Sequence, residues 1–143
     1  MAETDPDAPS IRDVIHVAEF RAALRQFMRR SERAARISGL TPQRHLLLLM
    51  IKGARDGSEQ STVTELAERL QLAQSTVTEL VRRAEEAGLV EREASSVDGR
   101  VAHLRLSPEG ERRLATSFRS HEQERAALHE AFRQLDLASP DAA

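Results

Sequence analysis

The chain has 143 residues, a formal net charge of −2 at pH 7 and no cysteine. This length supports one domain with its own core, and the lack of cysteine excludes disulfides, thiolate zinc sites and thiol-based redox sensing. The longest apolar run, residues 46–51, is far too short to cross a bilayer, and the acidic first residues lack the layout of a signal peptide. We therefore expect a cytoplasmic protein with no membrane partner.

The composition favours helix, because Ala, Leu, Glu and Arg are abundant while glycine, proline and aromatic residues are scarce. Residues 1–9 have the composition of a disordered tail. Residues 10–38 predict a long helix, with Ser10 as its cap and apolar residues at helical spacing to about Ile37. Gly39 is expected to end it.

Thr41 and Pro42 mark the start of a second helix, as N-cap and first helical residue. Residues 46–51 are apolar on nearly every side of this helix, which predicts a central place in the core. Residues 53–60 are expected to form a loop.

Two short helices are predicted next, joined by a tight turn. Residues 61–63 indicate a short β segment, and Thr64 is the expected N-cap of a two-turn helix. After the turn, a helix from about Gln74 to Ala87 is closed by Gly88. Its predicted buried stripe is Val77, Leu80 or Val81, and Ala84. Its other face presents Ser75, Thr76, Glu79, Arg82 and Arg83.

An apolar start, a polar middle and renewed alternation predict a β-hairpin between Leu89 and Leu106, with Asp98 and Arg100 at its tip. A helix, a turn, a second helix and a hairpin form a winged helix-turn-helix. This arrangement offers the polar face of the second helix to a DNA major groove. Arg100 is then placed to reach the DNA backbone or a narrow minor groove.

Ser107 and Pro108 give another cap-and-proline start, followed by a heptad-like stripe with two polar interruptions. The stripe is Leu114, Phe118, His121, Arg125, Leu128, Phe132 and Leu135. One helix over residues 107–137 would be roughly 40 Å long. A small lobe cannot cover that length, so we expect a second copy of the chain to cover it, with residues 138–143 as a tail.

The run TVTELAERLQLAQSTVTELVRRAEEAGLVER, the DGR tip and LRLSPEG resemble the MarR family of bacterial winged-helix transcriptional regulators. The resemblance is close over about residues 40–114. It implies a mainly α fold, with a winged helix-turn-helix DNA-binding lobe at 40–106, a small β-wing, and long N- and C-terminal dimerisation helices at 10–38 and 107–137. It also implies a homodimer that acts as a repressor and binds double-stranded DNA at a pseudo-palindromic operator. A small aromatic or anionic effector would release this homodimer from the DNA.

Position in this motif assigns base and phosphate contacts of the recognition helix to Gln74, Ser75, Thr76, Thr78, Glu79 and Arg82. Asp98 and Arg100 match the wing-tip pair, in which the arginine enters the minor groove and the aspartate holds the tip. Two residues depart from the pattern. Ala73 stands where a capping serine is usual, and Glu79 where a basic or small residue is common. A carboxylate at Glu79 is either repulsive or a specific acceptor from a cytosine amino group.

Charge is unevenly distributed. Residues 12–55 hold ten basic and three acidic residues, whereas residues 61–110 hold six arginines and nine acids. DNA-binding modules are usually basic, so the acidic balance favours the alternative of a winged-helix protein-interaction module without specific DNA binding. We favour DNA because polar residues and Arg100 occupy the reading positions, and the acidic balance then predicts few phosphate contacts and a modest salt dependence.

An arginine stripe runs down the first helix: Arg21, Arg25, Arg29, Arg33 and Arg36. A solvated face that pairs with acids of the last helix is the simpler interpretation. The functional hypothesis makes Arg25 or Arg29 an anchor for an anionic effector, with His45 as a further effector candidate. In an apolar helix, however, a histidine such as His45 is more often a core residue.

His121 and His129 stand eight residues apart, about two helical turns, so they cannot chelate one ion within a helix, and we expect no metal site. Without a phosphate-binding glycine loop, a nucleophile motif or paired carboxylates, we also expect no enzyme activity, no catalytic residue and no cofactor.

Overall fold

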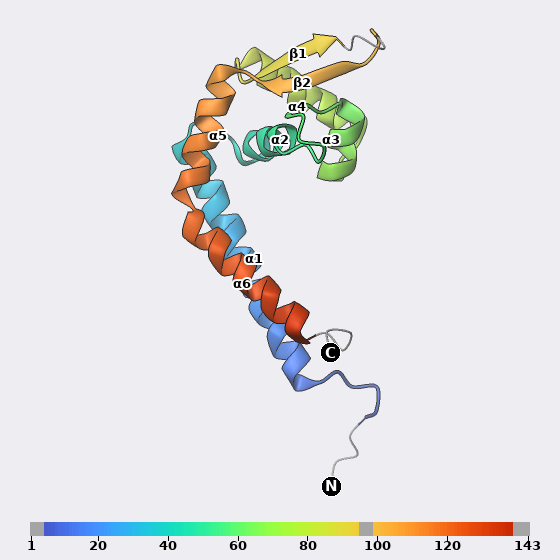
Figure 1. The fold of residues 1–143 in the computed structure, drawn as a ribbon, viewed down its shortest axis with the longest axis vertical. Coiled ribbons are helices and arrows are strands. Elements are labelled where there is room, and N and C mark those ends of the chain that lie inside the picture. Colours follow the sequence, from blue (N-terminus) through green and yellow to red (C-terminus); the bar gives the residue numbers. More distant parts are fainter. Residues whose placement is uncertain (1–4, 95–98, 139–143) are drawn as a thin grey trace. The chain divides into compact units, whose positions relative to one another are not determined.

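The computed structural model describes residues 5–94 and 99–138. In chain order the elements are α1 (Ile11–Ile37), α2 (Pro42–Lys52), α3 (Val63–Leu70), α4 (Gln74–Glu86), β1 (Val90–Ala94), β2 (Ala102–Leu106), α5 (Pro108–Ser120) and α6 (Glu122–Ala138) (Figure 1). The fold is mainly helical with a two-stranded antiparallel sheet, as the sequence predicted. The chain divides into two compact units. One is a winged-helix lobe, Glu32–Ser120, and the other is a helical unit made of Met1–Ser31 and His121–Ala143.

The core of the lobe is built around α2. Its Leu47, Leu48 and Ile51 are fully buried, and they belong to the same cluster as buried residues of α3, α4, β2 and α5. Full burial of one such side chain stabilises the fold by roughly 1.5–3 kcal/mol. The predicted central place of residues 46–51 is confirmed, except that Leu46 remains 42% exposed.

The start of α2 follows the sequence prediction. The Thr41 hydroxyl accepts a hydrogen bond from the Arg44 amide at 3.2 Å, and Pro42 is the first helical residue. Proline suits this position because its missing N–H has no intrahelical partner there.

The predicted cap of α3 was wrong by two residues. The helix begins at Val63, and Thr62 rather than Thr64 is the N-cap. The Thr62 hydroxyl accepts from the Glu65 amide at 3.2 Å and donates to the Glu65 carboxylate at 3.1 Å. Only Thr62 has a glutamate three residues later, which allows this reciprocal capping, so it outcompetes Thr64.

The turn between α3 and α4 is tight and left-handed. Gln71 has φ 56° and ψ 44°, and the Leu72 amide donates to the Ala67 carbonyl at 3.1 Å. The C-terminal end of α4 is followed by Gly88, whose φ of +73° suits a residue without a side chain. Two short helices are thereby joined as a helix-turn-helix.

The wing is an antiparallel pair with Val90 opposite Leu106 and Ala94 opposite Ala102. Ser61 forms a bridge to Leu104 in β2, so the β segment predicted at residues 61–63 is confirmed at Ser61 only, because Val63 already belongs to α3. Through this bridge the base of the wing is hydrogen-bonded to the helix-turn-helix.

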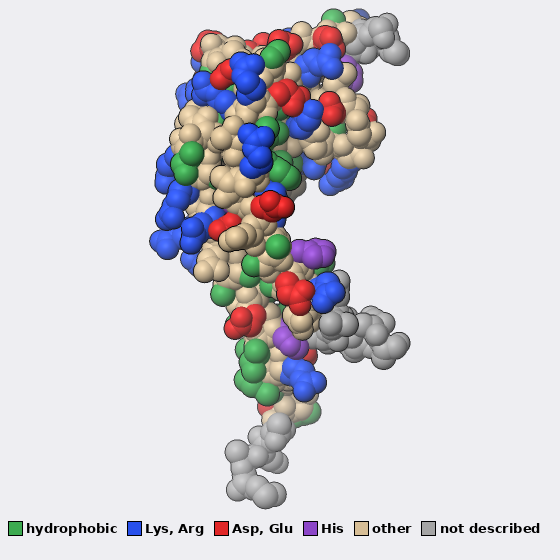
Figure 2. Space-filling model, turned by 60° about the vertical axis from the view of Figure 1, so that its left-hand side comes forward, with side chains coloured by type: hydrophobic (Ala, Val, Ile, Leu, Met, Phe, Trp, Pro, Cys, Tyr) green, Lys and Arg blue, Asp and Glu red, His purple; other side chains and the backbone are tan. Residues whose placement is uncertain are grey.

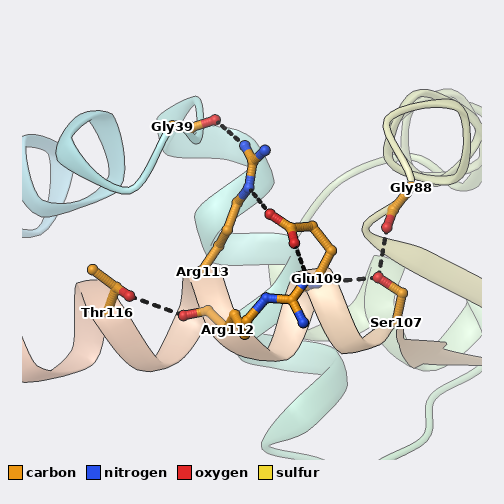
Figure 3. Close-up of polar contacts among 8 residues, drawn as sticks. Gly39, Gly88, Ser107, Glu109, Arg112, Arg113 and Thr116 are labelled. Carbon is orange, nitrogen blue, oxygen red and sulfur yellow. Dashed lines mark hydrogen bonds and ion pairs between the residues drawn. The ribbon is translucent and has the colours of Figure 1, made fainter.

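The start of α5 is attached to the end of α4 (Figure 3). The Ser107 hydroxyl donates to the Gly88 carbonyl at 2.6 Å and accepts from the Gly110 amide at 3.0 Å. The Ser107 amide donates to the Leu89 carbonyl at 3.0 Å. A side chain at Gly110 would overlap that same Leu89 oxygen, so α5 can approach this closely only with glycine there.

A second link joins α5 to the turn after α1. Arg113 donates to the Gly39 carbonyl at 2.9 Å and to the Glu109 carboxylate at 2.9 Å, and Arg112 pairs with Glu109 from the other side (Figure 3). The hydrogen bonds from Arg113 and then Arg112 lower the pKa of Glu109 below its ordinary value. Within the lobe, the turn after α1 and the end of α4 are thus both hydrogen-bonded to α5.

The single helix expected over residues 107–137 is divided at His121, where α5 has ended and α6 has not begun. The Ser117 hydroxyl donates to the Leu114 carbonyl and the Ser120 hydroxyl to the Ser117 carbonyl, each at 2.8 Å. Serine side chains that bond to backbone carbonyls compete with the helical ladder and bend helices. The prediction of one uninterrupted helix was therefore wrong.

The helical unit packs the first part of α1 against α6. The Phe20 and Phe132 rings meet edge to face, with centroids 6.0 Å apart, and the Phe27 ring lies 5.5 Å from that of His121. Apolar side chains along α1 nevertheless remain exposed, including Val14 and Ile15. A bilayer crossing needs a long apolar helix, and the described residues contain none.

Candidate nucleic-acid interface

The outer face of α4 carries all six residues predicted on the recognition helix. Val77, Val81 and Ala84 are fully buried against the core. Glu79 follows Val77 by two residues, about 200° around a helix of 3.6 residues per turn, so it lies opposite the buried stripe. The predicted neighbours on the exposed surface are Gln74, Ser75, Thr76, Thr78 and Arg82.

Glu79 is the centre of an ion-pair network along this face. Arg82 donates to both of its carboxylate oxygens, at 2.6 and 2.9 Å, and Arg83 donates to one of them at 3.1 Å. Arg82 also pairs with Glu86. The Glu79 and Arg82 side chains remain 44% and 54% exposed.

The network stabilises the charged form of Glu79. Hydrogen bonding from Arg82, followed by that from Arg83, lowers the pKa of Glu79 to about 2. Glu79 in turn raises the pKa of Arg82. Glu79 is therefore ionised at neutral pH and can only accept hydrogen bonds. The sequence prediction missed this network and the part of Glu86 in it, although spacings of three and four residues on a helix signal such pairs.

The first turn of α4 presents backbone and hydroxyl groups. Ala73 at the N-cap makes no side-chain hydrogen bond to the first amides, and amides at the start of a helix suit an external acceptor such as phosphate. Ser75 and Thr76 are exposed in this turn. Gln74 instead donates to the Thr64 hydroxyl at 3.4 Å, and Thr78 donates to the Gln74 carbonyl at 2.9 Å. These two side chains are thus partly engaged within the helix-turn-helix.

The wing accompanies this face within the same lobe. β1 packs against α4 (Figure 1), and Arg100 is exposed in the turn before β2. Asp98, the other predicted wing-tip residue, lies outside the described residues. The roles assigned to both side chains, and those of the α4 residues, stay predictions.

Residues 38–101 match the sequence profile of the MarR family. The matched segment begins directly after α1, stops directly before β2 and includes the whole helix-turn-helix.

The winged-helix lobe belongs to the MarR family.

Several solved structures of other proteins share the fold of this chain. A transcriptional regulator from Thermotoga maritima is 23% identical, with 82% of this chain and 84% of that chain covered and a TM-score of 0.62. S. aureus MepR, solved as a variant bound to an oligodeoxyribonucleotide, is 19% identical at 83% and 88% coverage and a TM-score of 0.62. E. coli MarR, solved as a variant complexed with operator DNA, is 19% identical at 94% and 91% coverage and a TM-score of 0.62. No curated protein sequence matches the chain significantly.

Acidic residues of the MarR lobe neutralise several of its arginines. Besides the α4 network, Arg92 pairs with Glu85 at 2.9 Å and Arg105 with Glu93 at 3.2 Å. Figure 2 shows basic and acidic side chains interspersed over the visible face of the lobe. Exposed pairs of this kind contribute only about 0.2–1 kcal/mol each, so a phosphate can replace a carboxylate at little cost.

The effector candidates are divided between the two units. In the helical unit, Arg25 and Arg29 are exposed on α1. In the lobe, His45 is 5% exposed within α2, as expected for a core histidine. An ion pair between α1 and α6 joins Arg30 to Glu124 at 3.8 Å, and Arg30 lies outside the predicted arginine stripe. An effector role for Arg25, Arg29 or His45 stays a prediction.

A groove that the sequence prediction missed lies between α1 and α6 in the helical unit. It encloses about 200 Å³ and is lined by Ala23, Gln26, Phe27, Arg30, Gln123, Glu124 and Ala127. Small residues from two facing helices were the available signal for it. Among the described residues, no three His, Asp or Glu side chains come together to hold a metal ion.

Proposed function

We propose that the chain is a sequence-specific DNA-binding transcriptional regulator that acts as a repressor. The observation that carries this proposal is the exposed polar face of α4, beside a wing bearing Arg100, in a MarR-family lobe. The S. aureus and E. coli proteins that share this fold were solved with DNA, which supports the proposal.

The contacts follow from the geometry of α4. Ser75 and Thr76 offer hydroxyls at the end of the helix that enters the major groove, and the first-turn amides suit a phosphate. Arg82, whose side chain is 54% exposed beside Glu79, adds phosphate or base contacts. Arg100 enters the adjacent minor groove, where arginine is favoured electrostatically.

A homodimer supplies the two-fold symmetry of a pseudo-palindromic operator, with half-sites about 34–36 Å apart. The helical unit leaves large apolar side chains exposed on a single chain, among them Val14, Ile15, Val17 and Phe132. A second copy that covers them removes this apolar surface from water, which is favourable by about 25 cal/mol per Å². The proposal places this regulator in the cytoplasm.

A small anionic effector is the finer part of the proposal. Arg25 and Arg29 offer exposed guanidinium groups on α1 that suit a carboxylate. Calorimetric titration with salicylate as a probe tests them. If the double variant Arg25→Ala/Arg29→Ala binds salicylate with the same affinity as the wild type, these two residues are not the effector site.

Selection of duplexes from a random pool by the purified full chain tests the DNA-binding proposal. We expect an enriched inverted repeat whose affinity falls with salt, and weaker binding by Arg100→Ala. Arg119→Ala is the matched control, because Arg119 is an exposed arginine on α5. No enrichment at low salt by a folded dimer would contradict the proposal and favour a winged-helix protein-interaction module.

A further inference from the structure

Glu79 lies on the outer face of α4, at a position that the sequence motif assigns to base contacts. It lies about 200° from the buried Val77, and its side chain is 44% exposed. An anion facing a duplex is repelled by phosphates unless it gains a specific donor. If Glu79 faces DNA, it therefore needs a hydrogen-bond donor on the base edges.

Few groups of the major groove can donate to a carboxylate. Because Glu79 is ionised, it needs an amino group, and only cytosine N4 and adenine N6 are available there. Adenine places the acceptor N7 beside its amino group, which repels a carboxylate, whereas cytosine has a C–H at the corresponding place. Cytosine is the base that suits Glu79.

The partner of Glu79 suits the other half of the same base pair. The guanine paired to cytosine presents the acceptors O6 and N7, the pattern that arginine reads with two parallel hydrogen bonds. Arg82 lies one helical turn from Glu79 and is held 2.6 Å from its carboxylate. The cytosine amino group is thus the donor for the Glu79 carboxylate, and the guanine O6 and N7 are the acceptors for the Arg82 guanidinium.

We propose that Glu79 and Arg82 together read one C·G base pair in each half-site, with Glu79 accepting from cytosine N4 and Arg82 donating to guanine. This inference rests on the proposed DNA-binding function and names the base pair that α4 selects. The ion pair positions both side chains before DNA arrives, so neither has to be ordered on binding. Arg83 also donates to one of the Glu79 carboxylate oxygens, at 3.1 Å.

The test compares duplex selections by the wild-type chain, Glu79→Gln, Glu79→Ala and Glu68→Gln. Glu68 is the matched control, an exposed glutamate on the neighbouring α3. Wild type and Glu68→Gln should fix C·G at one position of each half-site. Glu79→Gln should move that position toward A·T, because glutamine pairs with adenine N6 and N7. Glu79→Ala should weaken the C·G preference there, leaving only what Arg82 contributes through guanine, and should keep every other position.

Binding of single duplexes gives the size of the effect. Glu79→Gln should bind the C·G site roughly 5- to 150-fold more weakly than the wild type does. Circular dichroism establishes that each variant is folded. If the wild type selects no duplex, the proposed function fails and this inference with it. If the wild type selects a site and both Glu79 variants keep the same bases at every position, only this inference is overturned.

Discussion

Ser107→Ala tests how α5 holds the end of the recognition helix. The Ser107 side chain is buried, and its hydroxyl makes two hydrogen bonds, to the Gly88 carbonyl at 2.6 Å and from the Gly110 amide at 3.0 Å. Alanine removes both bonds without adding bulk. The Gly110 amide then lacks an acceptor in a site too tight for a replacement group, because even a methyl there would overlap a neighbouring carbonyl.

The expected cost follows from these two bonds. Loss of a helix N-cap costs about 0.5–2 kcal/mol, and a buried donor left without a partner costs about 1–3 kcal/mol. The two contributions overlap, because the Gly110 amide is the group that the cap satisfies. We therefore expect the free energy of unfolding to fall by about 2 kcal/mol, with a midpoint lowered by about 4–10 °C.

Urea and thermal unfolding, followed by circular dichroism at one fixed protein concentration, measure this change. Thr116→Ala is the matched control, because the Thr116 hydroxyl also donates to a helix carbonyl, at 3.0 Å, but is exposed. The control should stay within about 0.5 kcal/mol of wild type. Equal stability of the Ser107→Ala and Thr116→Ala proteins would refute the attachment of α5 to α4 through this hydroxyl.

Three further predictions follow from particular contacts. Gly110→Ala should lower the free energy of unfolding by about 1–3 kcal/mol, since its methyl overlaps a backbone oxygen, whereas Gly99→Ala, with open space around it, should change little in the same denaturation assay. Glu79→Ala releases Arg83 for a phosphate contact, so the plot of log affinity for random duplex against log salt concentration should become steeper by about 0.9 per protomer. Fluorescence anisotropy titrations between low and moderate salt measure this slope, and an unchanged slope would contradict the prediction. The pKa of Glu109 is lowered from 4.5 in the folded state, so its stabilisation is present above pH 4.5 and lost as the pH falls through the lower folded value. The stability gap between wild type and Glu109→Gln should therefore narrow on acidification; a gap independent of pH would contradict it.

Local signals explain why most elements were predictable. Thr41 with Pro42 marks the start of α2 unambiguously, and the buried stripe of α4 follows from spacing alone. Two neighbouring threonines compete at the start of α3, and the decision depends on Glu65, which serves Thr62 only. The sequence contained that signal, although the prediction placed the cap at Thr64.

Other features depend on contacts that no local pattern contains. Arg113 and Gly39 are 74 positions apart, and their hydrogen bond exists only once α5 packs beside the turn after α1. The division at His121 depends on which way serine hydroxyls turn, since Ser117 and Ser120 are otherwise acceptable inside a helix. In the candidate site, position identified Glu79 as unusual, but its simultaneous pairing with two arginines required the side-chain geometry.

The most direct test of the central claim is to locate α4 on DNA. The chain has no cysteine, so Ser75→Cys introduces a unique thiol that can carry an iron–EDTA chelate, which cleaves nearby DNA. On the selected duplex, the chelate at position 75 should cut inside each half-site, while the same chelate at Thr116→Cys on α5 should cut weakly or outside it. Cleavage that is equal from both positions, or absent from position 75 while the duplex is bound, would contradict the assignment of α4 as the recognition helix.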